Sequence, residues 1–141
     1  QFEKSIKMTK QEIKEEARSQ DLAPELKSRI RLLQRTLARK RMMQRVPQAD
    51  VVITNPTHLA IALQYDAAKM AAPRVVAKGQ RLVAEQIKEI ARTHGVPLVE
   101  NKPLAQALFR AVAVDQEVPR ELYKATAEVL AFIYRLTKKA S

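Results

Sequence analysis

Several residue types are scarce in this sequence, and each shortage excludes a class of function. The 141 residues contain no cysteine, no tryptophan and only two glycines. Without cysteine the chain forms no disulfide, carries out no thiol chemistry and offers no thiolate to a metal, which fits a reducing, intracellular compartment. Because aromatic residues make up only 4% of the chain, we expect an aliphatic core without large stacking surfaces.

Long apolar runs are missing as well. No stretch approaches the roughly 20 apolar residues that span a bilayer, and no signal-peptide pattern opens the sequence. The chain as it stands is therefore predicted to be soluble. It begins with Gln1 rather than Met, so a longer protein with membrane segments of its own is compatible with the sequence.

Basic residues give the chain a formal net charge of +11, and the excess lies at the front. The first 48 residues carry thirteen Lys or Arg and six Asp or Glu, a net charge of +7, whereas the remainder carries +4. A chain of this length fits one domain of ordinary size with room for an extension. We therefore predict a basic helical linker over residues 1–47 and a globular domain over residues 48–141.

The linker is predicted to contain a long helix. Residues 2–20 are rich in Lys, Glu and Gln and indicate a solvated helix or linker. Pro24 stands where a helix begins, and apolar residues then recur at helical spacing to about Met43, before Pro47 restricts the chain. The apolar face of this helix is Leu26, Ile30, Leu33 and Leu37, and its other face is Arg29, Arg31, Arg35, Arg39 and Arg41.

Two predicted strands flank a short polar motif. Residues 51–54 form a β-branched run, and residues 59–65 alternate large apolar residues with small or polar ones, and both patterns are typical of strands. Between them lies only Asn-Pro-Thr-His, residues 55–58. Because Asn and Pro favour the first two positions of a tight turn, we predict an antiparallel pair with this motif at its tip.

The remaining segments complete an α/β pattern. Residues 73–79 and 96–99 are predicted strands, and the helix between them, closed by Gly95, implies a right-handed parallel crossover. Two more helices are expected to open at Pro103 and Pro119. The predicted fold is a small mixed sheet of about four strands surrounded by about four helices, the first being the long N-terminal linker helix. The expected apolar faces of the last three helices are Leu82, Val83, Ile87 and Ile90; Leu104, Leu108, Ala111 and Val112; and Leu122, Thr126, Val129, Ile133 and Leu136.

The Asn55–Pro56 bond is the chemically distinctive feature of the motif. An asparagine usually forms a succinimide when the next backbone nitrogen attacks its side chain, but Pro56 has no N–H. In the remaining five-membered closure, the Asn55 side-chain nitrogen attacks the Asn55 carbonyl carbon and expels the Pro56 nitrogen, which breaks the chain. Well-oriented intramolecular reactions gain roughly 7–11 kcal/mol. The alternative is an ordinary turn that begins with Asn-Pro.

Two neighbouring residues can assist this reaction. A proton must leave the Asn55 nitrogen and another must reach Pro56, and positioned proton transfer contributes about 10²–10⁴-fold. Histidine is the residue type that exchanges protons near neutrality, so we interpret His58 as a proton relay or as a support of the turn. Thr57 can orient either group through its hydroxyl. Backbone N–H groups are expected to stabilise the oxyanion, but the sequence does not identify them.

Residues 50–58, Asp-Val-Val-Ile-Thr-Asn-Pro-Thr-His, closely resemble the hallmark of the FlhB/YscU/SpaS family, the autocleaving switch proteins of bacterial type III export machines. Where many members carry Arg and Tyr, this chain has Gln106 and Phe109, a difference that concerns surface recognition. The sequences of residues 64–66 and 72–79 resemble the flagellar branch of the family more than the virulence branch. The resemblance covers nearly the whole chain and continues through residues 62–66, 72–79, 95–97, 103–108 and 127–130.

The resemblance implies a function and a set of partners. Family members have an N-terminal membrane half that this chain lacks, so residues 1–47 would lie at the cytoplasmic face of the bacterial inner membrane, where Lys and Arg gain roughly 1 kcal/mol each from anionic lipid. A single-turnover self-cleavage, rather than enzymatic catalysis, would split the chain into residues 1–55 and 56–141, which strand pairing keeps together. Export would then turn from early substrates (rod, hook or needle subunits) to late ones (filament subunits or translocators). The implied partners are these export substrates, a length-control (ruler) protein and other export-gate components, and no cofactor is implied.

Two other classes of function fit the sequence less well. The net charge and the stripe of arginines from Arg29 to Arg45 indicate a basic nucleic-acid-binding module as an alternative. The stripe has no interleaved aromatics and no DNA-reading motif, so we predict no nucleic-acid partner. A conventional enzyme is disfavoured because His58 and His94 lack metal-ligand spacing and no glycine-rich phosphate loop is present, so no metal site is predicted. We interpret Glu85 and Glu89 as part of a solvated helix face, and His94 as a helix C-terminal residue.

Overall fold

The computed structural model describes residues 23–140, with side chains up to Thr137, and its centre is a four-stranded sheet of order β3-β2-β1-β4. Strand β1 pairs antiparallel with β2 on one side and parallel with β4 on the other, and β2 pairs antiparallel with β3. This arrangement confirms the predicted mixed sheet and makes β1 a central strand. The strands are β1 (Val51–Asn55), β2 (Leu59–Gln64), β3 (Arg74–Gln80) and β4 (Leu98–Glu100).

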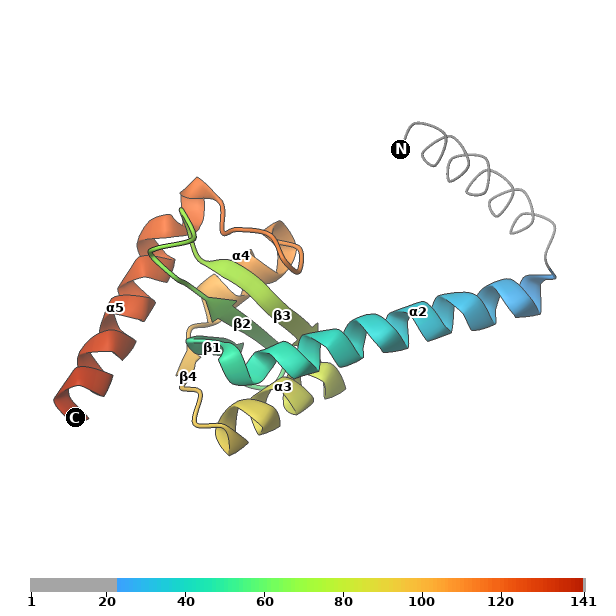
Figure 1. Ribbon diagram of the computed structural model, residues 1–141, viewed down its shortest axis with the longest axis horizontal. Helices are drawn as coiled ribbons and strands as arrows, with labels where there is room; N and C mark the ends of the chain where they lie inside the picture. Colours follow the sequence, from blue (N-terminus) through green and yellow to red (C-terminus); the bar gives the residue numbers. More distant parts are fainter. Residues whose placement is uncertain (1–22, 141) are drawn as a thin grey trace, which may run out of the picture. The chain divides into compact units, whose positions relative to one another are not determined.

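Helices cover both faces of this sheet (Figure 1). Helix α3 packs on one face, and α4 and α5 contribute to the core on the other. The helices, including two short 3-10 turns, are α2 (Pro24–Arg45), η1 (Val46–Gln48), α3 (Leu82–Thr93), α4 (Lys102–Ala111), η2 (Arg120–Leu122) and α5 (Tyr123–Ala140). The four α-helices among the described residues confirm the predicted α/β class.

Successive side chains of a strand point to opposite faces of the sheet, so each strand contributes to the core on both faces. In β1, Val51 and Ile53 face the α4 and α5 side, whereas Val52 faces α3. All three side chains are fully buried, and full burial of an aliphatic side chain stabilises a fold by about 1.5–3 kcal/mol. Since both faces of β1 are covered, this short strand carries a large share of the core.

The predicted hairpin is confirmed, with its register set by the turn. Asn55 pairs with Leu59, and Val51 pairs with Leu63 at the far end of the two strands. In β3 the register shifts by one residue, because Val76 is left without a partner in β2 and both it and Ala77 face α3. Such a bulge bends a strand locally.

The junction between β3 and α3 is unusually tight. A side chain at Gly79 would place its Cβ atom 2.2 Å from a methyl carbon of Val83, so only glycine allows α3 to approach the strand this closely. Arg81 links the two elements with φ 54° and ψ −119°, a conformation that L-residues rarely adopt. At the other end of α3, Gly95 has φ +72° and closes the helix as predicted.

Several predicted details are wrong. Leu82 is 81% exposed and Leu136 is 49% exposed, although each was expected on an apolar helix face. The buried stripe of α3 runs through Ala84, Ile87 and Ala91 and leaves Leu82 outside it, and the core contacts of α5 end at Ile133. Strand β4 begins at residue 98 rather than 96. The strands before and after α3 are parallel as predicted, and the connection through α3 passes over the two strands between them.

Helix α2 leads into the globular unit. The chain divides into two units, residues 1–39 and 40–141, and Met42, Met43 and Val46 already pack in the core of the second unit. In the first unit, the predicted apolar face of α2 (Leu26, Ile30, Leu33 and Leu37) is solvent-exposed. The solvated segment predicted for residues 2–20 lies outside the described residues. None of the described helices has the length and hydropathy needed to cross a membrane.

Candidate functional site

The Asn-Pro-Thr-His motif forms the turn between β1 and β2, as its residue types predict. Asn55 is the last residue of β1, and Pro56, Thr57 and His58 form the turn. The fixed φ of proline suits the second position of such a turn. The backbone N–H of His58 donates to the Asn55 carbonyl oxygen at 2.9 Å. This carbonyl belongs to the Asn55–Pro56 peptide bond, so the hydrogen bond draws electron density from the carbonyl carbon of that bond.

Burial changes abruptly at this peptide bond. Asn55 is only 6% exposed, whereas Pro56, Thr57 and His58 are all exposed. Within residues 23–140, neither the Asn55 side-chain amide nor the His58 ring forms a hydrogen bond with another residue. The structure therefore brings together Asn55, Pro56 and the backbone of His58, but it does not bring the side chains of Thr57 and His58 onto the amide.

The backbone of the turn is held at two further carbonyl groups. The His58 carbonyl accepts a hydrogen bond from the Arg81 backbone N–H at 3.1 Å. The Pro56 carbonyl accepts one from the Lys88 Nζ atom at 2.7 Å. Arg81 makes its contact from the strained β3–α3 junction, and strained backbone of this kind persists where the surrounding structure over-determines it.

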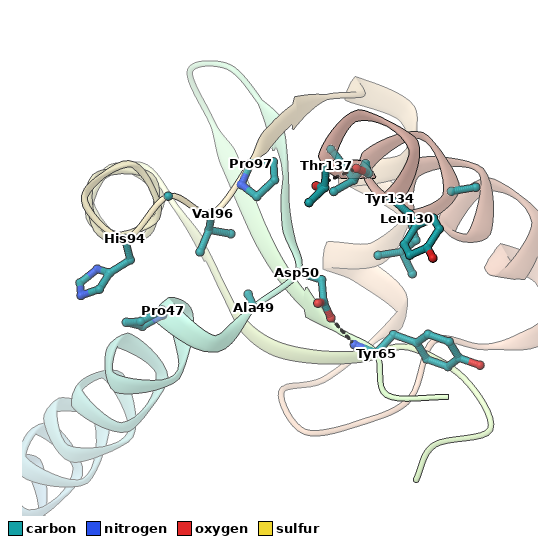
Figure 2. Close-up of a pocket in the computed structure, with 13 residues that line it drawn as sticks. Pro47, Ala49, Asp50, Tyr65, His94, Val96, Pro97, Leu130, Tyr134 and Thr137 are labelled. Carbon is teal, nitrogen blue, oxygen red and sulfur yellow. Dashed lines mark hydrogen bonds between the residues drawn. The ribbon is translucent and has the colours of Figure 1, made fainter. Parts of the chain in front are cut away.

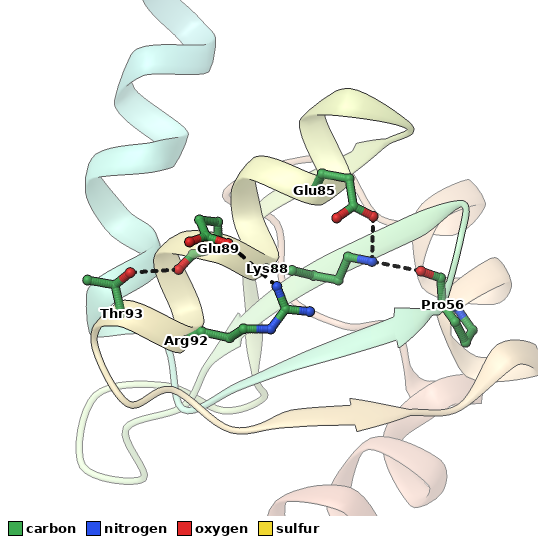
Figure 3. A network of polar contacts seen from close by, with 6 residues as sticks. All are labelled: Pro56, Glu85, Lys88, Glu89, Arg92 and Thr93. Carbon is green, nitrogen blue, oxygen red and sulfur yellow. Dashed lines mark hydrogen bonds and ion pairs between the residues drawn. The ribbon is translucent and has the colours of Figure 1, made fainter.

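Lys88 is the residue at this site that the sequence analysis missed. It lies on α3 and also forms an ion pair with Glu85, whose Oε1 atom is 2.7 Å from Nζ (Figure 3). The hydrogen bond and the charge of Lys88 lower the pKa of Glu85. The pair is therefore present above that lowered pKa and is lost as the pH falls through it. The sequence feature that could have indicated the burial of Lys88 is its spacing, because it follows Ala84 by four residues and so lies on the buried stripe of α3.

The other candidate residues lie away from the turn. Glu89 is exposed and contacts Arg92 at 3.7 Å, as expected for a solvated face. The His94 ring contacts the Ile90 carbonyl through Nδ1 at 3.0 Å, in line with its interpretation as a helix C-terminal residue. Among residues 23–140 no group of three or more His, Cys, Asp or Glu side chains is arranged to hold a metal ion.

A cleft of about 640 Å³ lies at the opposite end of β1 (Figure 2). Its walls come from the η1–β1 junction, the loop after α3, and α5, including Asp50, Val96 and Tyr134. The Asp50 carboxylate accepts a hydrogen bond from the Tyr65 backbone N–H at 2.7 Å. Because Asp50 precedes β1 and Asn55 ends it, this cleft is separate from the turn.

Two solved domains share this fold. The cytoplasmic domain of FlhB from Shewanella putrefaciens aligns with a TM-score of 0.70 and 41% sequence identity, covering 72% of this chain and 78% of that chain. A C-terminal domain of EscU with an asparagine-to-alanine mutation aligns with a TM-score of 0.63 and 25% identity, covering 65% and 92%. The fold thus defines the class: the chain has the fold of the cytoplasmic domain of FlhB and of the C-terminal domain of EscU.

The particular family follows from the sequence. The chain belongs to the FlhB HrpN YscU SpaS family, whose model matches residues 1–133. It is 53% identical over 138 residues to the flagellar biosynthetic protein FlhB of Bacillus subtilis, covering 98% of this chain and 38% of that protein. It is 48% identical over 135 residues to FlhB of Salmonella typhimurium, covering 96% and 35%. The chain therefore spans little more than a third of the length of these relatives.

Proposed function

We propose that this chain cuts its own backbone between Asn55 and Pro56, and that the cut changes which substrates a type III export machine accepts. The observation that carries the proposal is the geometry of the turn: a buried asparagine precedes an exposed proline, and a backbone N–H already donates to the carbonyl between them. Membership of the family supports it. The cut is a single intramolecular event, so the protein is not proposed as an enzyme.

The proposed reaction needs no external reactant. The Asn55 Nδ2 atom forms a bond to its own carbonyl carbon, the bond from that carbon to the Pro56 nitrogen breaks, and the proton lost by Nδ2 is delivered to the proline nitrogen. The products are a C-terminal succinimide on residue 55 and a free amine on Pro56. The His58 N–H, at 2.9 Å from the carbonyl oxygen, lies within the distance at which a donor stabilises a developing oxyanion.

The side chains of Thr57 and His58 are assigned supporting roles. Both are exposed, so they can exchange protons with solvent. We assign His58 to the relay that carries the proton from the amide nitrogen to proline, with support of the turn as its second role. Thr57 is assigned to orient the reacting groups through its hydroxyl.

The proposed switch acts through the surface of the whole domain. Since the cut falls at a hairpin tip, β1 and β2 stay paired while the turn becomes two free ends. We propose that this change turns export from early substrates, such as rod, hook or needle subunits, to late substrates, such as filament subunits or translocators. The proposed partners are these substrates, a length-control (ruler) protein and other components of the export gate, at the cytoplasmic face of the bacterial inner membrane.

The test is the state of the purified chain. We expect two fragments under denaturing conditions, residues 1–55 and 56–141, and a single species in native size-exclusion chromatography. Intact mass spectrometry should give two masses that sum to that of the unbroken chain, because cyclisation neither adds nor removes atoms before the succinimide hydrolyses. A chain that stays whole after prolonged incubation would refute self-cleavage.

Replacing His58 with alanine should slow the cut without abolishing it. The variant keeps the nucleophile and the backbone N–H at position 58, and it loses only the proton relay, which contributes about 10²–10⁴-fold. The cleaved fraction should be followed over time after synthesis in a cell-free system. Thr57→Val, which removes the hydroxyl and keeps the shape of the side chain, tests the orienting role of Thr57 separately. A His58→Ala rate equal to wild type would leave His58 with a structural role only.

A further inference from the structure

Lys88 is a charged residue in an apolar place. It lies in the middle of α3, on the buried stripe between Ile87 and Ala91, and is only 7% exposed. Lysine is almost never buried to this degree unless its ammonium group is paired. A buried ammonium also costs several kcal/mol unless hydrogen bonds replace its hydration. The burial of Lys88 therefore depends on its polar contacts as well as on helix packing.

Both polar contacts of Lys88 are short and directional. The Nζ atom donates to the Pro56 carbonyl oxygen at 2.7 Å and lies 2.7 Å from the Glu85 Oε1 atom. Figure 3 shows the ammonium group between the turn on one side and the first turn of α3 on the other. The side chain of Glu85 is 57% exposed, so it holds Lys88 from the solvent side. Lys88 thus joins the turn to α3.

The anchored carbonyl lies next to the bond that is proposed to break. The Pro56 carbonyl is the next peptide group after the Asn55–Pro56 bond. The proline ring fixes φ near −65° and the peptide group is planar, so anchoring the carbonyl fixes the remaining torsion of Pro56. The two backbone contacts of the turn, from His58 and Arg81, cannot be removed by a side-chain substitution, whereas the Lys88 contact can.

We propose that Lys88 is a positioning residue for the self-cleavage at Asn55–Pro56, and that Glu85 holds it in place. This inference rests on the function proposed above. Lys88 touches none of the atoms whose bonds change: Asn55 Nδ2 still attacks the Asn55 carbonyl carbon, the bond to the Pro56 nitrogen breaks, and the amide proton ends on that nitrogen. Its contribution is to hold the leaving proline in one orientation while the ring closes.

Lys88→Met should slow the cut by roughly 10–100-fold, because a displacement of about 1 Å at the reacting groups can cost 10²-fold. Lys88→Arg, which restores a cationic donor, should recover most of the rate. The measurement is the cleaved fraction against time after a pulse of cell-free synthesis. Arg92→Met is the matched control, since it removes an exposed cation of the same helix that contacts Glu89 rather than the turn, and its rate should equal that of wild type.

A purely structural role is separated by measurements on uncleavable protein. In an Asn55→Ala background, the carbonyl carbon-13 shift of Pro56 should move on Lys88→Met and return with Lys88→Arg. Thermal unfolding of the same variants reports their stability. If Lys88→Met does not fold, the Glu85→Gln variant tests the positioning role instead, because the exposed Glu85 side chain tolerates replacement. The Glu85→Gln chain should be cut several-fold more slowly than wild type.

The outcomes distinguish this inference from the proposed function. If wild-type protein stays whole, self-cleavage itself fails. If wild type is cut and a folded Lys88→Met variant is cut at the same rate, the positioning role of Lys88 is overturned. It is overturned equally if Arg92→Met slows the cut as much as Lys88→Met, if Lys88→Arg recovers nothing, or if Glu85→Gln is cut at the wild-type rate when Lys88→Met does not fold.

Discussion

Replacing Asn55 with alanine is expected to leave the 141-residue chain in one piece. The nucleophile of the proposed reaction is part of the residue whose carbonyl it attacks, so no other side chain closes the same five-membered ring. The intramolecular advantage that disappears with the amide is roughly 7–11 kcal/mol, or about 10⁵–10⁸-fold in rate. Cleavage at this bond should therefore fall below detection by intact mass spectrometry.

Asn101 provides a matched control for this variant. It lies close to the same strand end, where its backbone N–H donates to the Thr54 carbonyl oxygen at 3.0 Å, and its side chain caps α4 by accepting from the Leu104 N–H at 3.2 Å. Asn101→Ala should cost about 1 kcal/mol of stability through the lost cap and still be cut. An Asn55→Ala chain that breaks at residue 55 would point to a contaminating protease.

Once cut, the domain should unfold in a concentration-dependent way. The fragment that ends at Asn55 carries the central strand β1, together with Val46, so its removal opens both faces of the core. In the unbroken chain the turn holds this strand at an effective concentration on the order of 1 mM, as short linkers do. At about 10 μM protein this effective concentration is about 100-fold higher than the concentration of the separate fragments. The cut therefore lowers the free energy of unfolding by roughly 2.7 kcal/mol.

Thermal unfolding at two concentrations measures this effect. A tenfold dilution costs about 1.4 kcal/mol of association free energy, which should lower the Tm of the cut protein by about 5–10 °C for a unit of this size. The Asn55→Ala chain is the control, because its unfolding involves one molecule and its Tm should not change on dilution. Equal behaviour of the two proteins would show that the fragments do not separate on unfolding.

Much of the fold was predictable because its signals are local. The β-branched run before Asn55 and the alternation after His58 predicted both strands of the hairpin, and the turn residues predicted the tip between them. The end of α3 just before Gly95 was also predictable from local sequence, since the positive φ that often follows a helix favours glycine. These features depend on residues that are neighbours in the sequence.

Burial was less predictable because it depends on distant residues. Leu82 and Leu136 have the apolar character expected of core positions, yet the core that each helix meets does not reach them. Conversely, Lys88 has the character of a surface residue and is buried. Its partner, the Pro56 carbonyl, lies 32 residues away in the sequence, so no local pattern indicates the contact.

The bond that is proposed to break was identified from the sequence alone. A proline after Asn55 blocks the usual succinimide by removing an N–H, and this is a covalent property of two adjacent residues. The tertiary structure decided what surrounds that bond: which backbone N–H polarises its carbonyl, how deeply Asn55 is buried, and which side chain of α3 holds the proline. Those answers required the strand order and the approach of α3 to β3, because they depend on where the folded chain brings groups that are far apart in sequence.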